Sequence, residues 1–85
     1  MHALVRLIRK VFDDGLVRDE VIRSYTIEGE TWREVMEEYQ RRSRSLKDGL
    51  SLEFAFEDDA RRVLDEYNKL TPEERMDLYY ADGVD

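Results

Sequence analysis

The sequence predicts an α+β fold: a small antiparallel sheet, built from an N-terminal β-hairpin and one further strand, with helices packed on one face. Two observations carry this prediction. Residues 50–56 alternate strictly, with Leu50, Leu52, Phe54 and Phe56 on one face and Ser51, Glu53 and Ala55 on the other, which is typical of a half-buried strand. Three other segments repeat apolar residues at helical intervals. The expected element order is ββαβαα, with the strands in the order 2-1-3.

The first two strands are predicted from a turn signal at Asp14-Gly15, a dipeptide favoured in two-residue hairpin turns. Residues 3–12 also fit an amphipathic helix. We prefer the hairpin because the strand at 50–56 needs a backbone partner, which only residues 3–28 can supply. The expected cross-strand pairs are Phe12–Val17, Lys10–Asp19, Arg9–Glu20, Ile8–Val21, Leu7–Ile22 and Arg6–Arg23. Only the last pair is unfavourable, because it opposes two positive charges.

Three helices are predicted over residues 31–46, 58–70 and 72–81. Capping boxes mark two of the starts: Thr31 with Glu34, and Thr71 with Glu74, the latter with Pro72 at the first helical position. Neighbouring helix positions diverge by about 100°, so Tyr79 and Tyr80 cannot both face one core. The side chains expected to pack inward are Trp32, Val35, Met36, Tyr39, Leu46, Ala60, Val63, Leu64, Tyr67, Met76 and one of these two tyrosines.

Length and composition argue for one domain, residues 1–85, without catalytic machinery. The chain has no cysteine, which excludes disulfides and thiolate metal sites and favours a cytoplasmic location. Its one histidine, His2, lies near a terminus, where a catalytic group is hard to hold still. Paired carboxylates lie at turns, helix starts and polar faces, so we expect no enzyme, cofactor or dedicated metal site. A carboxylate-based hydrolase is the remote alternative.

The net charge of −7 arises entirely in the second half of the chain. Residues 1–45 carry nine basic and nine acidic side chains, whereas residues 46–85 carry five and twelve. An acidic balance disfavours nucleic acid and anionic membranes as partners and favours a basic protein surface. The basic run 41–47 is the one signal for nucleic acid. We interpret it instead as a complement to the helix dipole, paired with Glu37, Glu38 and Asp48.

Acidic side chains form the candidate binding face. On the helix at 58–70 they recur seven residues apart, on the side away from the core, and acids of the next helix extend the row. Ion pairs Asp58–Arg62 and Arg62–Glu66 are expected to neutralise part of it. The candidate partner-binding residues are Asp58, Asp59, Asp65, Glu66, Glu73, Glu74, Asp77, Tyr79 and Tyr80, with Asp82 and Asp85 extending the acidic row.

The sequence therefore favours a non-catalytic, acidic protein-binding domain, an inhibitor or adaptor whose acidic C-terminal helices occupy a basic, nucleic-acid-binding surface of a partner, as phage-encoded inhibitors do. The alternative is a structural protein that forms homo-oligomers, for example a homodimer, through an exposed sheet face or hairpin edge. In that case the acids serve only solubility. A third possibility, that residues 3–12 form a membrane-surface helix, lacks a second anchor, so no membrane partner is expected.

Overall fold

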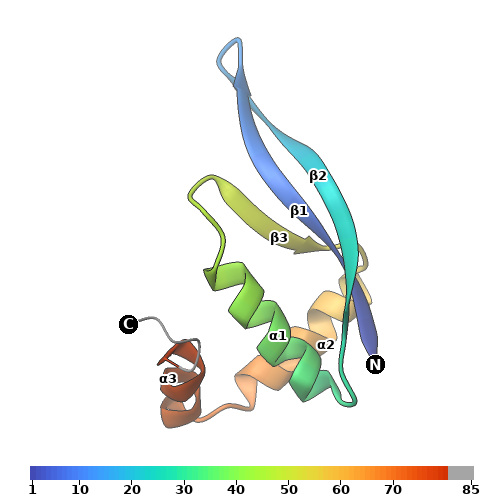
Figure 1. The fold of residues 1–85 in the computed structure, drawn as a ribbon, viewed down its shortest axis with the longest axis vertical. Coiled ribbons are helices and arrows are strands. Elements are labelled where there is room, and N and C mark those ends of the chain that lie inside the picture. Colours follow the sequence, from blue (N-terminus) through green and yellow to red (C-terminus); the bar gives the residue numbers. More distant parts are fainter. Residues whose placement is uncertain (81–85) are drawn as a thin grey trace.

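A long, twisted hairpin formed by β1 (His2–Asp13) and β2 (Leu16–Glu28) rises above the rest of the chain (Figure 1). The structure is a computed structural model that describes residues 1–80. The remaining elements are α1 (Trp32–Arg44), β3 (Leu50–Phe54), α2 (Glu57–Asn68) and α3 (Pro72–Tyr80). The strands form one antiparallel sheet in the order β2-β1-β3. This confirms the predicted α+β fold and its ββαβαα order.

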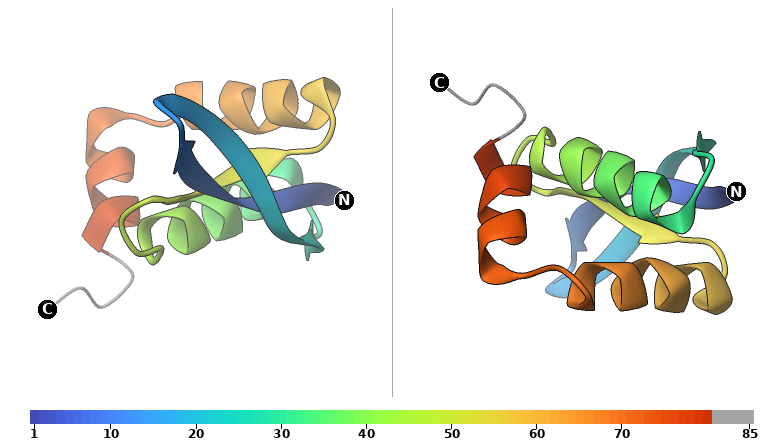
Figure 2. Two further views of the ribbon diagram at one scale, coloured as in Figure 1. Left: turned by 90° about the horizontal axis from the view of Figure 1, so that it is seen from above. Right: turned by 90° about the horizontal axis from the view of Figure 1, so that it is seen from below.

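The helices cover one face of the sheet. α1 and α2 lie side by side beneath it, and α3 lies across their ends (Figure 2). The core between these layers consists of side chains that are at most 6% exposed: Ala3, Val5, Ile27, Val35, Met36, Val63 and Leu70. On the other face of the sheet the exposed polar side chains are His2, Ser24, Thr26, Glu28, Ser51 and Glu53, whereas Ile8 is only 3% exposed.

The hairpin turn confirms that residues 3–12 form a strand and not a helix. Asp14 and Gly15 have φ angles of 50° and 79°, the positive values that a two-residue type I′ turn requires at both central positions. This turn matches the right-handed twist of the flanking strands. It sets the predicted register close to the turn, where Phe12 pairs with Val17 and Ile8 with Val21.

A β-bulge at Ile22 shifts the register farther from the turn. Leu7 pairs with Arg23 and not with Ile22, and Arg6 pairs with Ser24, so these two predicted pairs were wrong. The shift separates Arg6 from Arg23 and removes the predicted contact between like charges. It also pairs Val5 with Tyr25 and Ala3 with Ile27. Apolar residues of both strands therefore meet on the helix-covered face.

Both predicted capping boxes form, one of them in a modified way. At α3, the Thr71 hydroxyl accepts from the Glu74 N–H at 3.1 Å and the Glu74 carboxylate accepts from the Thr71 N–H at 2.9 Å. At α1, the Thr31 hydroxyl accepts from the Glu34 N–H at 3.2 Å. The Glu34 carboxylate, however, accepts from the N–H of Glu30, one residue before the cap, at 2.7 Å.

Some side chains that were expected to face inward are exposed. The strand predicted over residues 50–56 ends at Phe54, and Phe56, at the end of the predicted strand, is exposed and precedes α2. On α2, Val63 is buried and the adjacent Leu64 is 56% exposed, because neighbouring helix positions point about 100° apart. α3 packs through Leu78 and leaves Met76 exposed. The predicted last residue of α3, Ala81, lies outside the described residues.

Gly29 allows α1 to approach the hairpin closely. A Cβ atom at this position would lie 2.8 Å from the Cβ of Glu34 and 3.1 Å from the backbone nitrogen of Val35. These neighbours belong to the first turn of α1, so they cannot yield by a change of side-chain rotamer. The contact ties the start of the helix to the end of β2.

We expect Gly29→Ala to lower the free energy of unfolding by about 1–3 kcal/mol, because the added methyl group forces α1 away from the hairpin. Gly49→Asn is the control: Gly49 has φ 86° and nothing within 4 Å, and asparagine tolerates this backbone conformation. Urea unfolding followed by circular dichroism measures both. Equal stability of the two variants would contradict the close approach at Gly29.

A second prediction concerns the face that α2 buries. Val63→Ala should cost about 1.5–3 kcal/mol, because Val63 is 3% exposed and its methyl groups would leave the core. Leu64→Ala removes more atoms but from an exposed side chain, so it should cost less than about 0.5 kcal/mol. The same urea titration measures the loss of unfolding free energy in both variants. A larger loss at Leu64 would mean that α2 is rotated relative to the structure.

Candidate functional site

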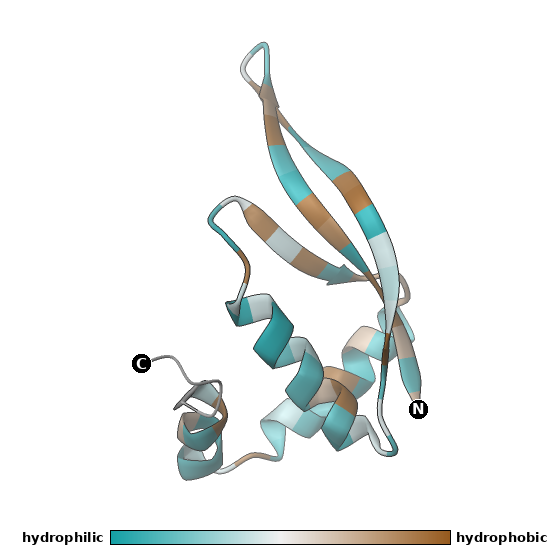
Figure 3. Cartoon of the chain, viewed as in Figure 1, coloured by the Kyte–Doolittle hydropathy of each residue, from teal (hydrophilic) through white to brown (hydrophobic). Residues whose placement is uncertain are grey.

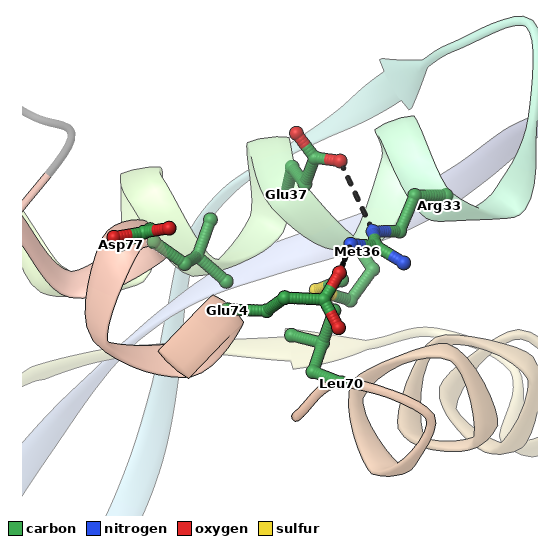
Figure 4. A pocket seen from close by; sticks show the side chains of 7 residues that line it. Arg33, Met36, Glu37, Leu70, Glu74 and Asp77 are labelled. Atoms are coloured by element: carbon green, nitrogen blue, oxygen red, sulfur yellow. Dashed lines mark hydrogen bonds and ion pairs between the residues drawn. The ribbon is translucent and has the colours of Figure 1, made fainter. Parts of the chain in front are cut away.

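A hollow between α1 and α3 brings acidic side chains together around one arginine (Figure 4). Its floor is apolar, with Met36 from α1, Leu70 from the segment before α3, and Leu78. Arg33 lies between two carboxylates: its Nε is 3.3 Å from Glu37, and its guanidinium donates to Glu74 at 2.9 Å.

A second hollow continues along the same side of α1. It shares Glu37 and Leu78 with the first, so the two form one surface. We call this surface the acidic groove. Seven acidic side chains line it against two basic ones, Arg33 and Arg41; the acids are Glu28, Glu30, Glu34, Glu37, Glu38, Glu74 and Asp77.

The helix starts orient the carboxylates of this groove. Residues 34, 37, 38 and 41 recur at helical spacing and therefore share one side of α1. The capping box holds Glu74 at the first turn of α3, within reach of Arg33. The Thr71 N–H, first, and then Arg33 lower the pKa of the Glu74 carboxyl. Glu74 therefore stays ionised under conditions that protonate an ordinary glutamate.

Part of the groove's charge is not neutralised. Glu38 pairs with both Arg41 and Arg42, and Glu37 pairs with Arg33. Among the residues that the structure describes, Glu28, Glu30 and Asp77 take part in no ion pair. The groove therefore combines an apolar floor with carboxylates that are available to cations.

The structure does not arrange the predicted partner-binding residues in one row. Glu74 and Asp77 line the acidic groove, whereas Asp58 and Asp59 lie at a separate hollow beside Trp32. Asp65 and Glu66 follow along α2, and Glu73 is exposed at the start of α3. The nine residues thus occupy at least two surfaces.

The predicted aromatic anchors lie at the end of α3. Tyr79 is 55% exposed, and the guanidinium of Arg44 lies 5.2 Å from its ring centroid. Tyr80 is the last residue of α3, and its side chain is outside what the structure describes. Asp82 and Asp85 also lie outside the described residues.

The ion pairs on α2 differ from those expected. Arg62 pairs with Asp59 at 3.6 Å, and neither predicted pair of Arg62, with Asp58 or with Glu66, forms among the described residues. Glu57 pairs with Arg61 and Glu66 with Lys69, each at 3.2 Å. Three of the five acids of α2 are therefore paired within the helix or with the residue that follows it.

The basic run 41–47, which begins in the last turn of α1, is partly engaged with the protein itself. Glu38 pairs with two of its arginines, as expected, whereas Glu37 pairs with Arg33 instead. Arg44 donates to the backbone carbonyl oxygen of Leu78 and so holds α3 against α1. These contacts support a structural role for the run.

The prediction from sequence missed the five acids of the groove that lie in residues 28–38. Their negative charge was counted together with the positive charge of residues 41–47. Residues 28–38 contain five acids and one arginine. Residues 41–47 contain four basic side chains and cancel them in a count over residues 1–45. A charge count over a window of about ten residues would have found this cluster.

The groove has the chemistry of a binding surface. Its two hollows have volumes of about 270 Å³ and about 460 Å³, below or at the low end of the usual range of about 300–1,000 Å³ for small-molecule pockets. Within residues 1–80, no group of three or more His, Asp or Glu side chains is arranged to hold a metal ion. An elongated groove with acidic walls and an apolar floor suits a macromolecular segment that carries positive charge.

The lowered pKa of Glu74 predicts a specific pH dependence. Because its pKa is lower in the folded state than in the unfolded state, its contribution to stability is present above the unfolded pKa and is lost as the pH falls through the folded pKa. Glu74→Gln should therefore lower the melting temperature near about pH 7 and have little effect near about pH 2.5. The adjacent, exposed Glu73→Gln is the control. A pH-independent effect of Glu74→Gln would contradict this interpretation.

Comparison with protein-family models, with curated proteins and with solved structures returned no match for this chain. None of the helices within residues 1–80 combines the length and the apolar content needed to cross a bilayer. The interpretation of the site therefore rests on its geometry and charge.

Proposed function

We propose that this chain is a non-catalytic protein-binding domain, an inhibitor or adaptor that acts in the cytoplasm and binds a basic surface of a partner protein. The observation that carries the proposal is the acidic groove, in which seven acids face two arginines over an apolar floor. Two separate helices, α1 and α3, hold five of these seven carboxylates, so binding orders few side chains and loses little conformational entropy.

The groove suits a surface that otherwise holds nucleic acid. Carboxylates fixed along α1 and at the start of α3 present a row of negative charge, as a phosphate backbone does. Met36, Leu70 and Leu78 add an apolar strip to this row. The strip can accept the aliphatic stem of a lysine or arginine while the carboxylates bind its charged head.

The predicted partner-binding residues have different parts in this proposal. Glu74 and Asp77 belong to the groove itself. Tyr79 lies one helical position beyond Leu78 and is exposed, so it can extend the contact at the end of α3 as an aromatic anchor. The acids of α2 lie on other surfaces, where they contribute long-range attraction and solubility.

Charge neutralisation tests which surface binds. The immobilised chain should capture a partner from cell lysate, and added duplex DNA or heparin should release that partner. Glu28→Gln, Glu30→Gln and Asp77→Asn together should weaken capture at least about tenfold, or about 1.4 kcal/mol. None of these three side chains supports a cap or an ion pair among the described residues, so the fold should be retained.

The control removes the same charge elsewhere. Asp58→Asn, Asp65→Asn and Glu73→Gln replace three exposed acids outside the groove. This triple variant should capture the partner as the original chain does, apart from a slower association rate at low salt. Weaker capture by the control alone would place the binding face on α2. Unchanged capture by both variants, or capture that is insensitive to salt, would contradict the proposed function.

A further inference from the structure

The distal part of the hairpin extends beyond the third strand. β3 pairs only with Val5–Arg9 of β1, so the hairpin continues past it without a third strand (Figure 1). We call residues 9–22 the arm. The four residues from Lys10 to Asp13 extend the arm about 13 Å beyond Leu50, the β3 residue that pairs with Arg9, at about 3.3 Å per residue. The arm helps to raise the radius of gyration to 14.1 Å, against about 12 Å for a compact domain of this length.

The arm exposes an unusual amount of apolar surface. Five of the ten large apolar side chains that are exposed in the described residues belong to it: Phe12 at 78%, Leu16 at 73%, Val17 at 55%, Val21 at 50% and Ile22 at 44%. Apolar bands continue along the hairpin to its turn (Figure 3). Three of them, Phe12, Val17 and Val21, share one face and together expose on the order of 300 Å² of apolar surface, taking about 150–200 Å² for each fully exposed side chain. Apolar patches of a few hundred Å² on soluble proteins commonly mark contact sites.

One face of the arm is suited to contact with a flat partner. Phe12 and Val17 are directly opposed, as are Lys10 and Asp19 and then Ile8 and Val21, so all three pairs share a face. By the same alternation this face is opposite the one that carries Ala3 and Val5. Ile8 is only 3% exposed, so the exposed apolar part of the face consists of Phe12, Val17 and Val21. Its central charges already satisfy each other, because Lys10 and Asp19 form an ion pair at 2.5 Å. Contact with this face therefore requires no opposite charge from the partner.

Charge indicates that the partner is a second copy. The arm holds three basic and four acidic residues, so it is nearly neutral, whereas the whole chain carries −7. Two acidic bodies repel each other, and the arm allows contact while the bodies remain apart. Burying Phe12, Val17 and Val21 in both copies removes about 600 Å² of apolar surface, which corresponds to about 1,000 Å² in total at the usual apolar share. That area is at the lower limit for a specific interface and suits a weak to moderate dimer.

We propose that two copies of this chain associate through their arms, packing the faces that carry Phe12, Val17 and Val21 against each other about a twofold axis. Such an interface is isologous, so each arm contributes the same side chains. The acidic grooves lie at the other end of each molecule, among the helices (Figure 1). The dimer therefore presents two grooves to its surroundings, whatever binds there.

Sedimentation velocity and light scattering test the proposal on the purified chain alone. The original chain should shift from the monomer mass to twice that mass between about 1 μM and 1 mM, the range of dissociation constants for weak to moderate interfaces. Phe12→Thr with Val17→Thr should raise the dissociation constant at least about tenfold. Threonine is β-branched and favours strands, so the hairpin is retained; far-ultraviolet circular dichroism checks this.

The matched control removes two exposed apolar side chains from the helices, Leu64 at 56% and Met76 at 58% exposure. Leu64→Gln with Met76→Gln should dimerise as the original chain does, because neither side chain belongs to the arm. Added salt should strengthen the dimer, since it screens repulsion between the acidic bodies. A chain that stays monomeric throughout, or a Phe12→Thr, Val17→Thr variant that dimerises like the original, would overturn the proposal. Neither result affects partner capture by the groove, which weakens with salt.

Discussion

The register shift at Ile22 is the constraint on which the rest of the fold depends. A regular ladder continued from the Asp14-Gly15 turn would place Ser24 opposite Val5 and Thr26 opposite Ala3, because side chains alternate with a period of two. The bulge places Tyr25 and Ile27 there instead. Ala3, Val5 and Ile27 then form the buried floor on which α1 packs. One unpaired residue thus converts two strands with mismatched patterns into one apolar face.

Most of the fold could be predicted because its signals are local. Asp14-Gly15 specifies a turn by backbone conformation, and Thr71 with Glu74 specifies a helix start by hydrogen bonding; both signals lie within a few residues. The bulge could not be predicted in this way, because it satisfies a pattern that spans both strands. The unfavourable Arg6–Arg23 pair was a sign that the simple register had to end. It is the first predicted pair with like charges.

The errors on the helices have a different cause. Spacing indicates which residues share a side of a helix, but contacts with other elements decide which side faces inward. α3 is short, and its orientation is set by links from α1, where Arg33 reaches Glu74 and Arg44 reaches the carbonyl oxygen of Leu78. Those links bring Leu78 to the core in place of Met76. They also move Glu74 and Asp77 toward α1, so the predicted row of acids is divided. The acidic groove combines carboxylates from the end of β2, from α1 and from α3. Reading any one of these segments alone therefore does not predict it.

The bulge also separates the hairpin into two parts with different freedom to vary. Below it, the apolar side chains of one face pack against the helices. Beyond Lys10, the two strands pair only with each other, so the turn at Asp14-Gly15 can be moved outward by adding residues two at a time, one to each strand, while the buried face formed by Ala3, Val5 and Ile27 keeps its pattern. A family built on this scaffold would be free to change the reach of its hairpin from member to member. A guest peptide spliced between Asp14 and Gly15 would likewise be displayed far from the helices.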